Sequence, residues 1–197
     1  LWAGKRAVRI ALSYPEAKTF FPERKQDKIA ITGNPIRQDL LSPLSAGARE
    51  FLGLEPDLPI VYVTGGSQGA MAINDTLIDV LPSLLTKCQI VHQVGEKNLA
   101  DVTRRVSTVL EQSPHRTRYK LFAFLDSSAI RMVAGAAAVA VSRAGSSIFE
   151  FAQWGLPVIL IPIPESISHD QRTNAFTYAR SGGAVVIEQG NLTPSVL

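Results

Sequence analysis

The sequence IVYVTGGSQGA at positions 60–70 decides the fold. Residues 60–63 form an apolar run of the length of a buried strand, and a helix-like segment begins near Ala70. Between them lies a glycine-rich turn, where main-chain N–H groups point out of the helix start and an anion such as phosphate can approach. We therefore predict half of a nucleotide pocket at this turn, although many α/β proteins turn on glycines without binding a ligand.

Downstream of Pro59, apolar runs alternate regularly with longer amphipathic segments. The strands are predicted at 60–64, 89–94, 119–122, 137–142, 158–161 and 184–187, and the helices at 70–86, 99–112, 127–134, 146–154 and 171–181. Several of these strands are continuously apolar, as expected when both faces of a parallel sheet are covered. The order of six βα steps predicts an α/β fold with an open, doubly wound, Rossmann-like parallel sheet.

The residues before Pro59 follow another pattern. We predict a helix with basic and apolar residues at 1–13, a short strand at 28–32 and a short helix at 46–52. The surrounding segment is rich in Pro and Gly, which is typical of a linker. The resulting domain prediction is the end of one domain at 1–40, a linker at 41–58 and a second domain at 59–197 that is truncated at its C-terminal end. Because the chain opens without a start methionine, we expect it to be part of a longer one.

The composition is that of an ordinary soluble globular protein, with 197 residues, 46% hydrophobic and 19% charged. A net charge of +3 suits phosphate-bearing or anionic-membrane partners but is too small to argue for nucleic acid, and no nucleic-acid motif is present. The single cysteine, Cys88, excludes a disulfide framework and a cysteine metal cluster. We therefore expect a cytoplasmic protein without a metal or other cofactor.

In an open parallel sheet, ligands bind outside the carboxyl ends of the strands. Polar residues gather in the turns predicted there. They are Gly65, Gly66, Ser67, Gln68 and Gly69 in the first turn, Gly95 and Glu96 in the second, Asp126 in the third, Ser142, Arg143, Gly145, Ser146, Ser147 and Glu150 in the fourth, and His169, Gln171 and Asn174 in the fifth.

Two of these turns are suited to a diphosphate. The helix starts at Gly69 and Gly145 face one crevice, and Ser67 adds a hydroxyl donor. The carboxylate of Glu150 can accept two hydrogen bonds in a fork, which matches the two hydroxyls of a ribose. The alternative for Glu150 is a first-turn glutamate that stabilises its helix N-terminus.

The remaining polar residues have weaker assignments. Gln171 and Asn174 lie on one face of a helix at its start, and their amides suit sugar hydroxyls, with local capping and solvation as the alternative. His169 is more often a locally bonded residue than a catalyst, and His92 is less promising because it lies inside a strand run. The cluster of Phe122, Phe124 and Leu125 is predicted to be core at a strand end, with a base-stacking platform as the alternative.

The sequence lacks the residues that other nucleotide-binding and catalytic motifs require. No Gly-Lys-Ser/Thr closes the first turn, so a P-loop is excluded, and the glycine spacing does not fit a dinucleotide fingerprint. Zinc ligands and a Gly-x-Ser-x-Gly elbow are missing as well. The residues alone thus predict a nucleotide or nucleotide-sugar site on a doubly wound domain.

Several motifs agree in order and spacing with a known family. They read TGNPIR at 32–37, GGSQGA at 65–70, SRAGSSIFE at 142–150, GLP at 155–157, IPIP at 161–164 and QRTNA at 171–175. In this order they resemble the C-terminal part of the MurG family, GT-B glycosyltransferases of family 28. The resemblance runs from about Phe20 to the last residue.

The resemblance implies an enzyme that transfers N-acetylglucosamine from UDP-N-acetylglucosamine to a lipid-linked muramyl-pentapeptide, with inversion and without a metal. It implies a UDP-sugar site with Arg37 and Ser67 at the diphosphate, the Leu125 backbone at the uracil, Glu150 at the ribose, and Gln171 and Asn174 at the N-acetylglucosamine. Gly66 and Gln68 would belong to the same site, and the helix start at Gly145 and Ser146 would neutralise the leaving UDP.

The resemblance also implies what this chain lacks. The acceptor site and the catalytic base of the family lie in an N-terminal domain that is nearly absent here, so we expect the chain to be inactive alone. The implied location is cytoplasmic and peripheral, on the inner face of the cell membrane. Alternatives are a non-catalytic UDP-sugar-binding subunit of a split glycosyltransferase, a related GT-B enzyme with another acceptor, and a UDP-sugar epimerase.

Overall fold

The computed structural model describes residues 6–66, 70–167 and 169–197. The chain forms two compact units, Leu1–Arg37 and Gln38–Leu197.

The first unit is built on a two-stranded parallel sheet. Strand β1 (Ile10–Leu12) pairs with β2 (Ile29–Ile31), and the 3₁₀ helices η2 (Pro15–Phe20) and η3 (Glu23–Lys28) connect them. Strand β2 confirms the strand predicted at 28–32. The predicted helix at 1–13 is wrong for residues 10–12, and residues 1–5 lie outside the described part. Strand β1 forms because β2 supplies main-chain hydrogen bonds from far along the sequence, which helical periodicity cannot reveal.

The second unit contains the six-stranded parallel sheet that the sequence predicts, with the strand order β5-β4-β3-β6-β7-β8. The strands are β3 (Ile60–Thr64), β4 (Gln89–Gln93), β5 (Tyr119–Phe122), β6 (Val139–Ser142), β7 (Val158–Leu160) and β8 (Ala184–Val186). The α-helices are α1 (Ala48–Leu52), α2 (Met71–Leu84), α3 (Leu99–Val109), α4 (Ser127–Ala136), α5 (Ser147–Trp154) and α6 (His169–Ala179). Short 3₁₀ helices are η4 (Gln38–Leu40), η5 (Glu96–Asn98), η6 (Arg116–Arg118) and η7 (Gln189–Asn191). The predicted fold class is confirmed.

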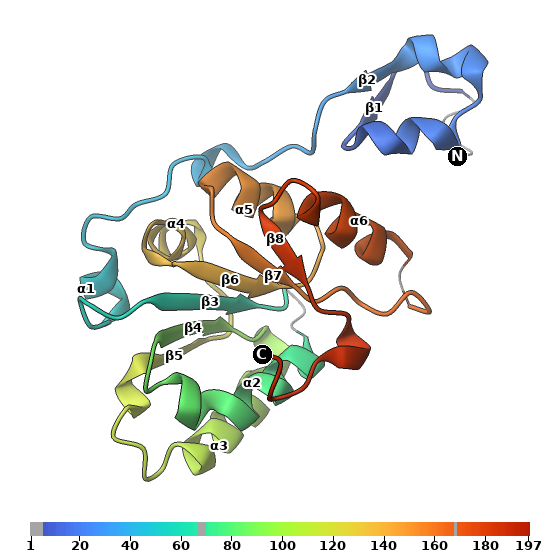
Figure 1. The fold of residues 1–197 in the computed structure, drawn as a ribbon. Helices are drawn as coiled ribbons and strands as arrows, with labels where there is room; N and C mark the ends of the chain where they lie inside the picture. Colours follow the sequence, from blue (N-terminus) through green and yellow to red (C-terminus); the bar gives the residue numbers. More distant parts are fainter. Residues whose placement is uncertain (1–5, 67–69, 168) are drawn as a thin grey trace. The chain divides into compact units, whose positions relative to one another are not determined.

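Helices cover both faces of this sheet (Figure 1). Helices α2 and α3 lie on one face and α4, α5 and α6 on the other. On the first face, Ile73 and Leu77 of α2 are buried in one cluster with Ile90 of β4. On the second face, the ring of Phe151 packs edge-on against Trp154. These two layers explain why most strands read as apolar runs, because helices cover both faces at the centre of the sheet.

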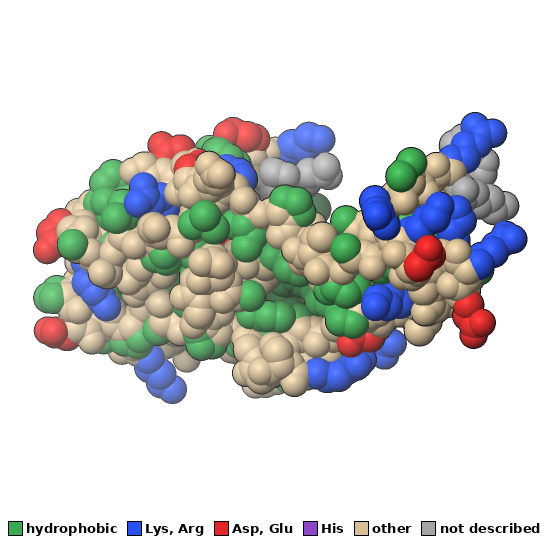
Figure 2. Space-filling model, turned by 90° about the horizontal axis from the view of Figure 1, so that it is seen from above, with side chains coloured by type: hydrophobic (Ala, Val, Ile, Leu, Met, Phe, Trp, Pro, Cys, Tyr) green, Lys and Arg blue, Asp and Glu red, His purple; other side chains and the backbone are tan. Residues whose placement is uncertain are grey.

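The outer surface of the α4–α6 layer has a mixed composition. Figure 2 shows hydrophobic side chains interspersed with polar and charged ones. Within the described part of the chain, no helix combines the length and the apolar character that crossing a membrane requires.

The strand order reverses direction between β3 and β6. After β3 the chain adds β4 and β5 on one side, and after β6 it adds β7 and β8 on the other. In open parallel sheets this switch point opens a crevice at the carboxyl ends, where ligands bind. The register pairs Thr64 with Ser142, so the turns that follow β3 and β6 start side by side.

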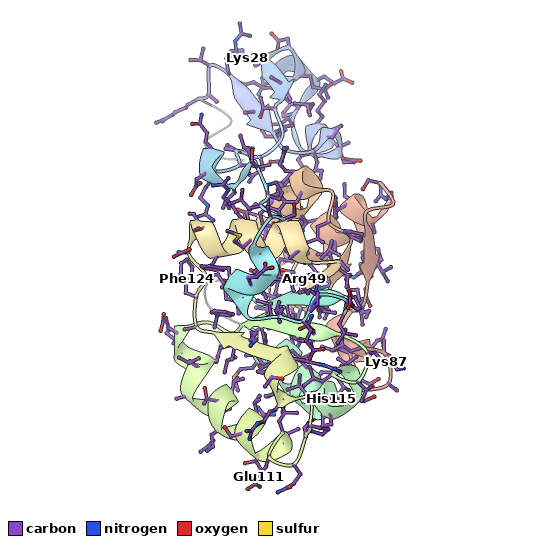
Figure 3. All side chains as sticks on the ribbon, turned by 90° about the vertical axis from the view of Figure 1, so that its left-hand side faces the viewer. Lys28, Arg49, Lys87, Glu111, His115 and Phe124 are labelled. Carbon is purple, nitrogen blue, oxygen red and sulfur yellow. The ribbon has the colours of Figure 1, made fainter. Side chains whose placement is uncertain are left out.

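The segment before β3 belongs to the second unit and is held against helix α4. Leu44 donates its N–H to the carbonyl of Arg131 on α4 at 2.9 Å, and Arg131 Nε donates back to the carbonyl of Ser42 at 2.8 Å. Arg49 of α1, labelled in Figure 3, donates to the carbonyls of Glu55 and Leu58. The two compact units divide after Arg37, and the functional domain boundaries stay a prediction.

Candidate functional site

A row of residues ends the central strands at the carboxyl edge of the sheet. Register aligns Phe122 with Gln93, Gln93 with Thr64, Thr64 with Ser142 and Ser142 with Leu160. Three members of this row are polar and buried, which is unusual in a sheet that is covered on both faces. The polar members mark the switch point as the candidate site.

The turn after β3 is held by its own strand end. Gly66 has a φ of +79°, the left-handed region that favours glycine, and its N–H donates to Thr64 Oγ1 at 3.1 Å. Open space surrounds the position where a Cβ of Gly66 would lie. A ligand can therefore approach the main chain closely at this glycine. Ser67, Gln68 and Gly69, which the sequence places in the same turn, lie outside the described residues.

The turn after β6 leads into helix α5. Space is open around Gly145, and Ser146 is exposed at the helix N-cap without a side-chain capping bond. The N-terminus of a helix carries unpaired N–H groups and the positive end of its dipole. This arrangement suits the binding of an anion, and the role of Gly145 and Ser146 in such binding stays a prediction.

Ser142 lies immediately before this turn. Its side chain is 1% exposed, and no described residue forms a hydrogen bond with its Oγ. A buried hydroxyl without a partner is uncommon and carries a cost in free energy. The hydroxyl is thus a polar group at the switch point whose hydrogen-bonding capacity is not met from within the described chain.

Glu150 lies one turn into α5 and is half-buried. Burial raises the pKa of Tyr62 to about 12; a hydrogen bond with the Thr64 side chain opposes this rise, and the Glu150 carboxylate adds to it. The carboxylate of Glu150 therefore interacts electrostatically with Tyr62 on β3, next to the switch point.

Two side chains hold the loop after β7. Arg143 Nη1 donates to the carbonyl of Ile161 at 3.0 Å and to that of Pro162 at 3.3 Å, and burial lowers the pKa of Arg143. Gln171 Oε1 accepts the N–H of Ile163 at 3.3 Å. The Gln171 oxygen thus has a local main-chain donor, whereas the Asn174 side chain is half-buried on the same helix. The His169 side chain lies outside the described part.

The turn after β5 differs from its prediction in one respect. Leu125 is 1% exposed, as expected of a core residue, but Phe124 is 55% exposed and lies at the edge of the ribbon in Figure 3. The prediction of a core position is therefore wrong for Phe124, because the turn directs neighbouring side chains to opposite sides. The N–H of Leu125 donates to Gln93 Oε1 at 3.1 Å, so an internal acceptor already engages this main-chain group.

Sequence reasoning missed the polar residues of β4. His92 is fully buried; its Nδ1 lies 2.8 Å from the Tyr119 hydroxyl and its Nε2 lies 3.1 Å from Asn74 Oδ1. Burial lowers the pKa of His92 to about 3, so the ring is neutral and its role is structural. The available signal was the occurrence of polar residues within a strand that the sequence predicts to be buried.

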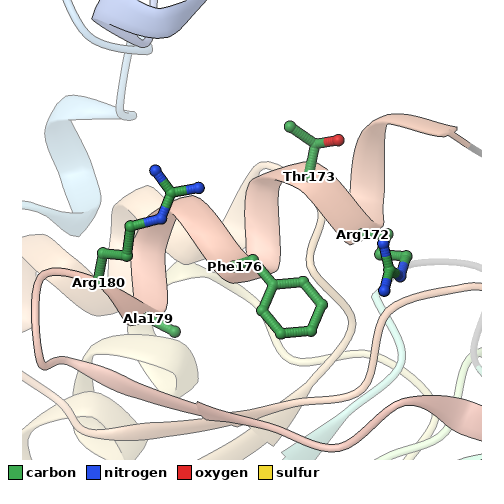
Figure 4. A pocket seen from close by; sticks show the side chains of 5 residues that line it. All are labelled: Arg172, Thr173, Phe176, Ala179 and Arg180. Atoms are coloured by element: carbon green, nitrogen blue, oxygen red, sulfur yellow. The ribbon is translucent and has the colours of Figure 1, made fainter.

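A shallow groove of about 620 Å³ lies on the outer side of α6 (Figure 4). Its lining residues are Arg172, Thr173, Phe176, Ala179 and Arg180. By helical spacing they occupy a different face from Gln171 and Asn174. The groove is thus separate from the predicted sugar-binding residues. Arg37 belongs to the first unit and is not placed relative to the switch point.

Comparison with known proteins identifies the family. Residues 60–197 match the glycosyltransferase family 28 C-terminal domain. The chain belongs to glycosyltransferase family 28. The matched range begins with β3 and includes every strand of the switch-point sheet.

The relatives within family 28 agree with this assignment. The chain is 32% identical over 195 residues to the UDP-N-acetylglucosamine--N-acetylmuramyl-(pentapeptide) pyrophosphoryl-undecaprenol N-acetylglucosamine transferase of Treponema denticola, covering 98% of the chain and 50% of that protein. The chain spans about half the length of the curated relatives it matches. The resemblance to the C-terminal part of the MurG family is confirmed.

Solved structures share the fold. MurG of Acinetobacter baumannii superimposes with a TM-score of 0.69 at 23% identity, over 99% of this chain and 51% of that one. A UDP-glucose:anthocyanidin 3-O-glucosyltransferase in complex with UDP gives a TM-score of 0.62 at 18% identity, over 96% of this chain and 42% of that one. At these identities the likeness shows the GT-B type of fold that family 28 was predicted to have.

Proposed function

We propose that this chain supplies the donor-binding part of a glycosyltransferase that transfers N-acetylglucosamine from UDP-N-acetylglucosamine to a lipid-linked muramyl-pentapeptide. The observation that carries the proposal is the pairing of Thr64 with Ser142, which sets the open turn at Gly66 beside the N-terminus of α5. The printed names of the family 28 relatives supply the reaction.

The donor lies across the switch point in this proposal. The diphosphate meets the main chain near Gly66, together with Ser67 and Gln68, and the helix start at Gly145 and Ser146. Glu150 accepts the ribose hydroxyls, and Gln171 and Asn174 hold the sugar. The Gln171 NH₂ group remains for the sugar, since Ile163 engages the oxygen of this amide.

The chemistry follows from charge. In an inverting transfer the acceptor hydroxyl oxygen attacks the anomeric carbon as the bond to the diphosphate breaks, and UDP leaves with the bonding electrons. The hydroxyl proton passes to a base that this proposal places outside the present chain. The N–H groups and dipole at the start of α5 stabilise this negative charge where it develops. The proposal uses no metal ion and assigns no catalytic base to this chain.

Calorimetric titration of the 197-residue chain with UDP-N-acetylglucosamine, UDP-glucose and ADP-glucose tests the proposal. We expect UDP-N-acetylglucosamine to bind more tightly than UDP-glucose, and ADP-glucose to bind weakest. If none of the three bound, the donor site would be wrong. We expect no sugar transfer by the chain alone, so turnover of the lipid-linked acceptor would contradict the proposed division of labour.

Charge also supports peripheral contact with an anionic membrane. Residues 1–37 contain eight Lys and Arg against three Asp and Glu, and Val8 and Phe20 are exposed in this unit. Basic residues beside exposed apolar side chains favour anionic lipid surfaces. Sedimentation with anionic but not with neutral vesicles, weakened by salt, is the expected result; equal sedimentation with both would contradict it.

A further inference from the structure

The side chain of Gln93 joins two turns of the candidate site. Gln93 ends β4, between β3 and β5, and is 5% exposed. Its Oε1 accepts the N–H of Leu125 at 3.1 Å, and its Nε2 donates to Thr64 Oγ1 at 3.4 Å. The Leu125 N–H requires an oxygen as its partner, which fixes the orientation of the amide and turns Nε2 toward Thr64.

Thr64 extends this connection to the glycine turn. Its Oγ1 also accepts the N–H of Gly66 at 3.1 Å, so one hydroxyl oxygen receives hydrogen bonds from the turn and from Gln93. A series of hydrogen bonds, partly buried at Gly66 and buried at Gln93, thus runs from Gly66 through Thr64 and Gln93 to Leu125. Buried, satisfied polar networks of this kind hold their members in one arrangement.

We propose that Gln93 is a positioning residue of the donor pocket, which holds the glycine turn after β3 and the turn after β5 in one fixed spacing. The inference rests on the proposed function, in which the first turn meets the diphosphate, and on the contact between the Leu125 backbone and the uracil that the family resemblance implies. Gln93 acts on UDP through these two turns and does not touch it.

Removing the Gln93 amide breaks the hydrogen bonds to both turns. A Gln93→Met substitution keeps the length of the side chain but leaves the buried Leu125 N–H without its acceptor and Thr64 without one donor. Both turns then gain alternative arrangements, and binding must select the competent one. UDP affinity falls about tenfold, in line with the penalty for an unsatisfied buried group.

Gln89 offers a matched control on the same strand. It lies four residues before Gln93, on the same face of β4, and is fully buried. Its Oε1 accepts the N–H of Glu55 at 2.7 Å and its Nε2 donates to the carbonyl of Glu55 at 2.9 Å. Gln89 therefore also uses both the oxygen and the nitrogen of its amide, but at the amino ends of the strands.

The experiment compares wild-type, Gln93→Met, Gln89→Met and Thr64→Val forms of the 197-residue chain. UDP binding is measured by calorimetry, uridine and inorganic diphosphate by competition, and Tm by thermal unfolding. Both glutamine variants should lower Tm, but only Gln93→Met should weaken UDP, uridine and diphosphate alike. Thr64→Val removes the acceptor of Gly66 and of Gln93 Nε2 but keeps the hydrogen bond from Leu125 to Gln93 Oε1, so it should weaken diphosphate and leave uridine unchanged.

Each outcome decides between the two proposals. Wild-type UDP affinity in Gln93→Met, with Tm lowered as in Gln89→Met, would reduce Gln93 to a structural residue. If Gln93→Met did not fold, unchanged diphosphate affinity in Thr64→Val would overturn the inference, and a selective loss would support it. Failure of the wild-type chain to bind UDP would instead overturn the proposed function.

Discussion

Glu150 is the residue on which the proposed ribose contact depends. Its carboxylate lies in the first turn of α5, near the buried hydroxyl of Tyr62. Hydrogen bonds to a charged group contribute about 1.5–3 kcal/mol, so Glu150→Gln should weaken UDP about tenfold or more. Calorimetry with UDP and with its 2′-deoxy analogue measures this, and the penalty for the missing 2′-hydroxyl should shrink in the variant.

The alternative for Glu150 is stabilisation of its helix, and Asp101 is the control. Asp101 is a first-turn carboxylate on α3, where it pairs with Arg104 and Arg105. Asp101→Asn should leave UDP affinity unchanged. If the Glu150→Gln chain bound UDP and 2′-deoxy-UDP as tightly as the wild-type chain does, Glu150 would only stabilise its helix.

The buried His92 makes the stability of the fold depend on pH. Its pKa is about 3 in the folded chain against an ordinary value of 6.5, so the unfolded state takes up a proton at a higher pH than the folded state does. Stability is therefore lost as pH falls from 6.5 toward 3, by about 1.4 kcal/mol per pH unit. Urea unfolding at several pH values should show a shallower loss for His92→Gln.

The control for this slope is His115, which lies in the loop before β5 (Figure 3). His115→Gln should keep the wild-type loss of stability between pH 6.5 and pH 4.5. Equal slopes for His92→Gln and the wild-type chain would show that another group carries the acid dependence.

Sequence reasoning found the strand-end residues but not the residues that support them. Gly66, Gly145 and Glu150 could be predicted because they follow apolar runs at positions where parallel sheets bind ligands. Gln93 could not, since its role depends on Thr64 and Leu125, which reach it from neighbouring strands. The signal in the sequence was a polar residue inside a buried strand, and it did not reveal the partner.

Helix α4 approaches the preceding segment so closely that only glycine fits at position 135. A Cβ at Gly135 would lie 2.3 Å from the carbonyl carbon of Leu44. In most helices a Gly→Ala substitution raises stability. At position 135 the added Cβ would clash with main-chain atoms, so Gly135→Ala should instead lower the free energy of unfolding by about 1–3 kcal/mol. The free energy of unfolding in urea measures the effect.

Gly190 serves as the matched glycine. A Cβ added there meets no atom within 4 Å, so Gly190→Ala should leave stability nearly unchanged. Gly135→Ala that is as stable as the wild-type chain would mean that the 42–45 segment moves away from α4 at little cost.

The elements of the sheet were predictable to different degrees. Strands β3 and β5 begin and end as predicted, and for β3 the reason is plain, because its apolar run is bounded by Pro59 and Gly65. Strand β1 was missed, since three residues carry no period and gain their hydrogen bonds from β2. The packing of residues 42–45 onto α4 could not be predicted from the sequence either, because it depends on a tertiary contact at Gly135.

At the scale of the whole molecule, the strand order brings the starts of the two glycine turns side by side. The turns after β3 and β6 are separated by two strands in sequence but are neighbours in the sheet. The family 28 match covers this sheet, and the chain spans about half the length of its relatives. We therefore propose that the chain is the donor-binding part of the transferase.

Amide hydrogen exchange with and without UDP tests the position of the donor site most directly. The account predicts slower exchange with UDP in the turn at 65–66 and at the start of α5, residues 145–150. Exchange should stay unchanged at the opposite edge of the sheet, in 53–58. Protection confined to that opposite edge, or no protection near α5 at saturating UDP, would contradict a donor site at the switch point.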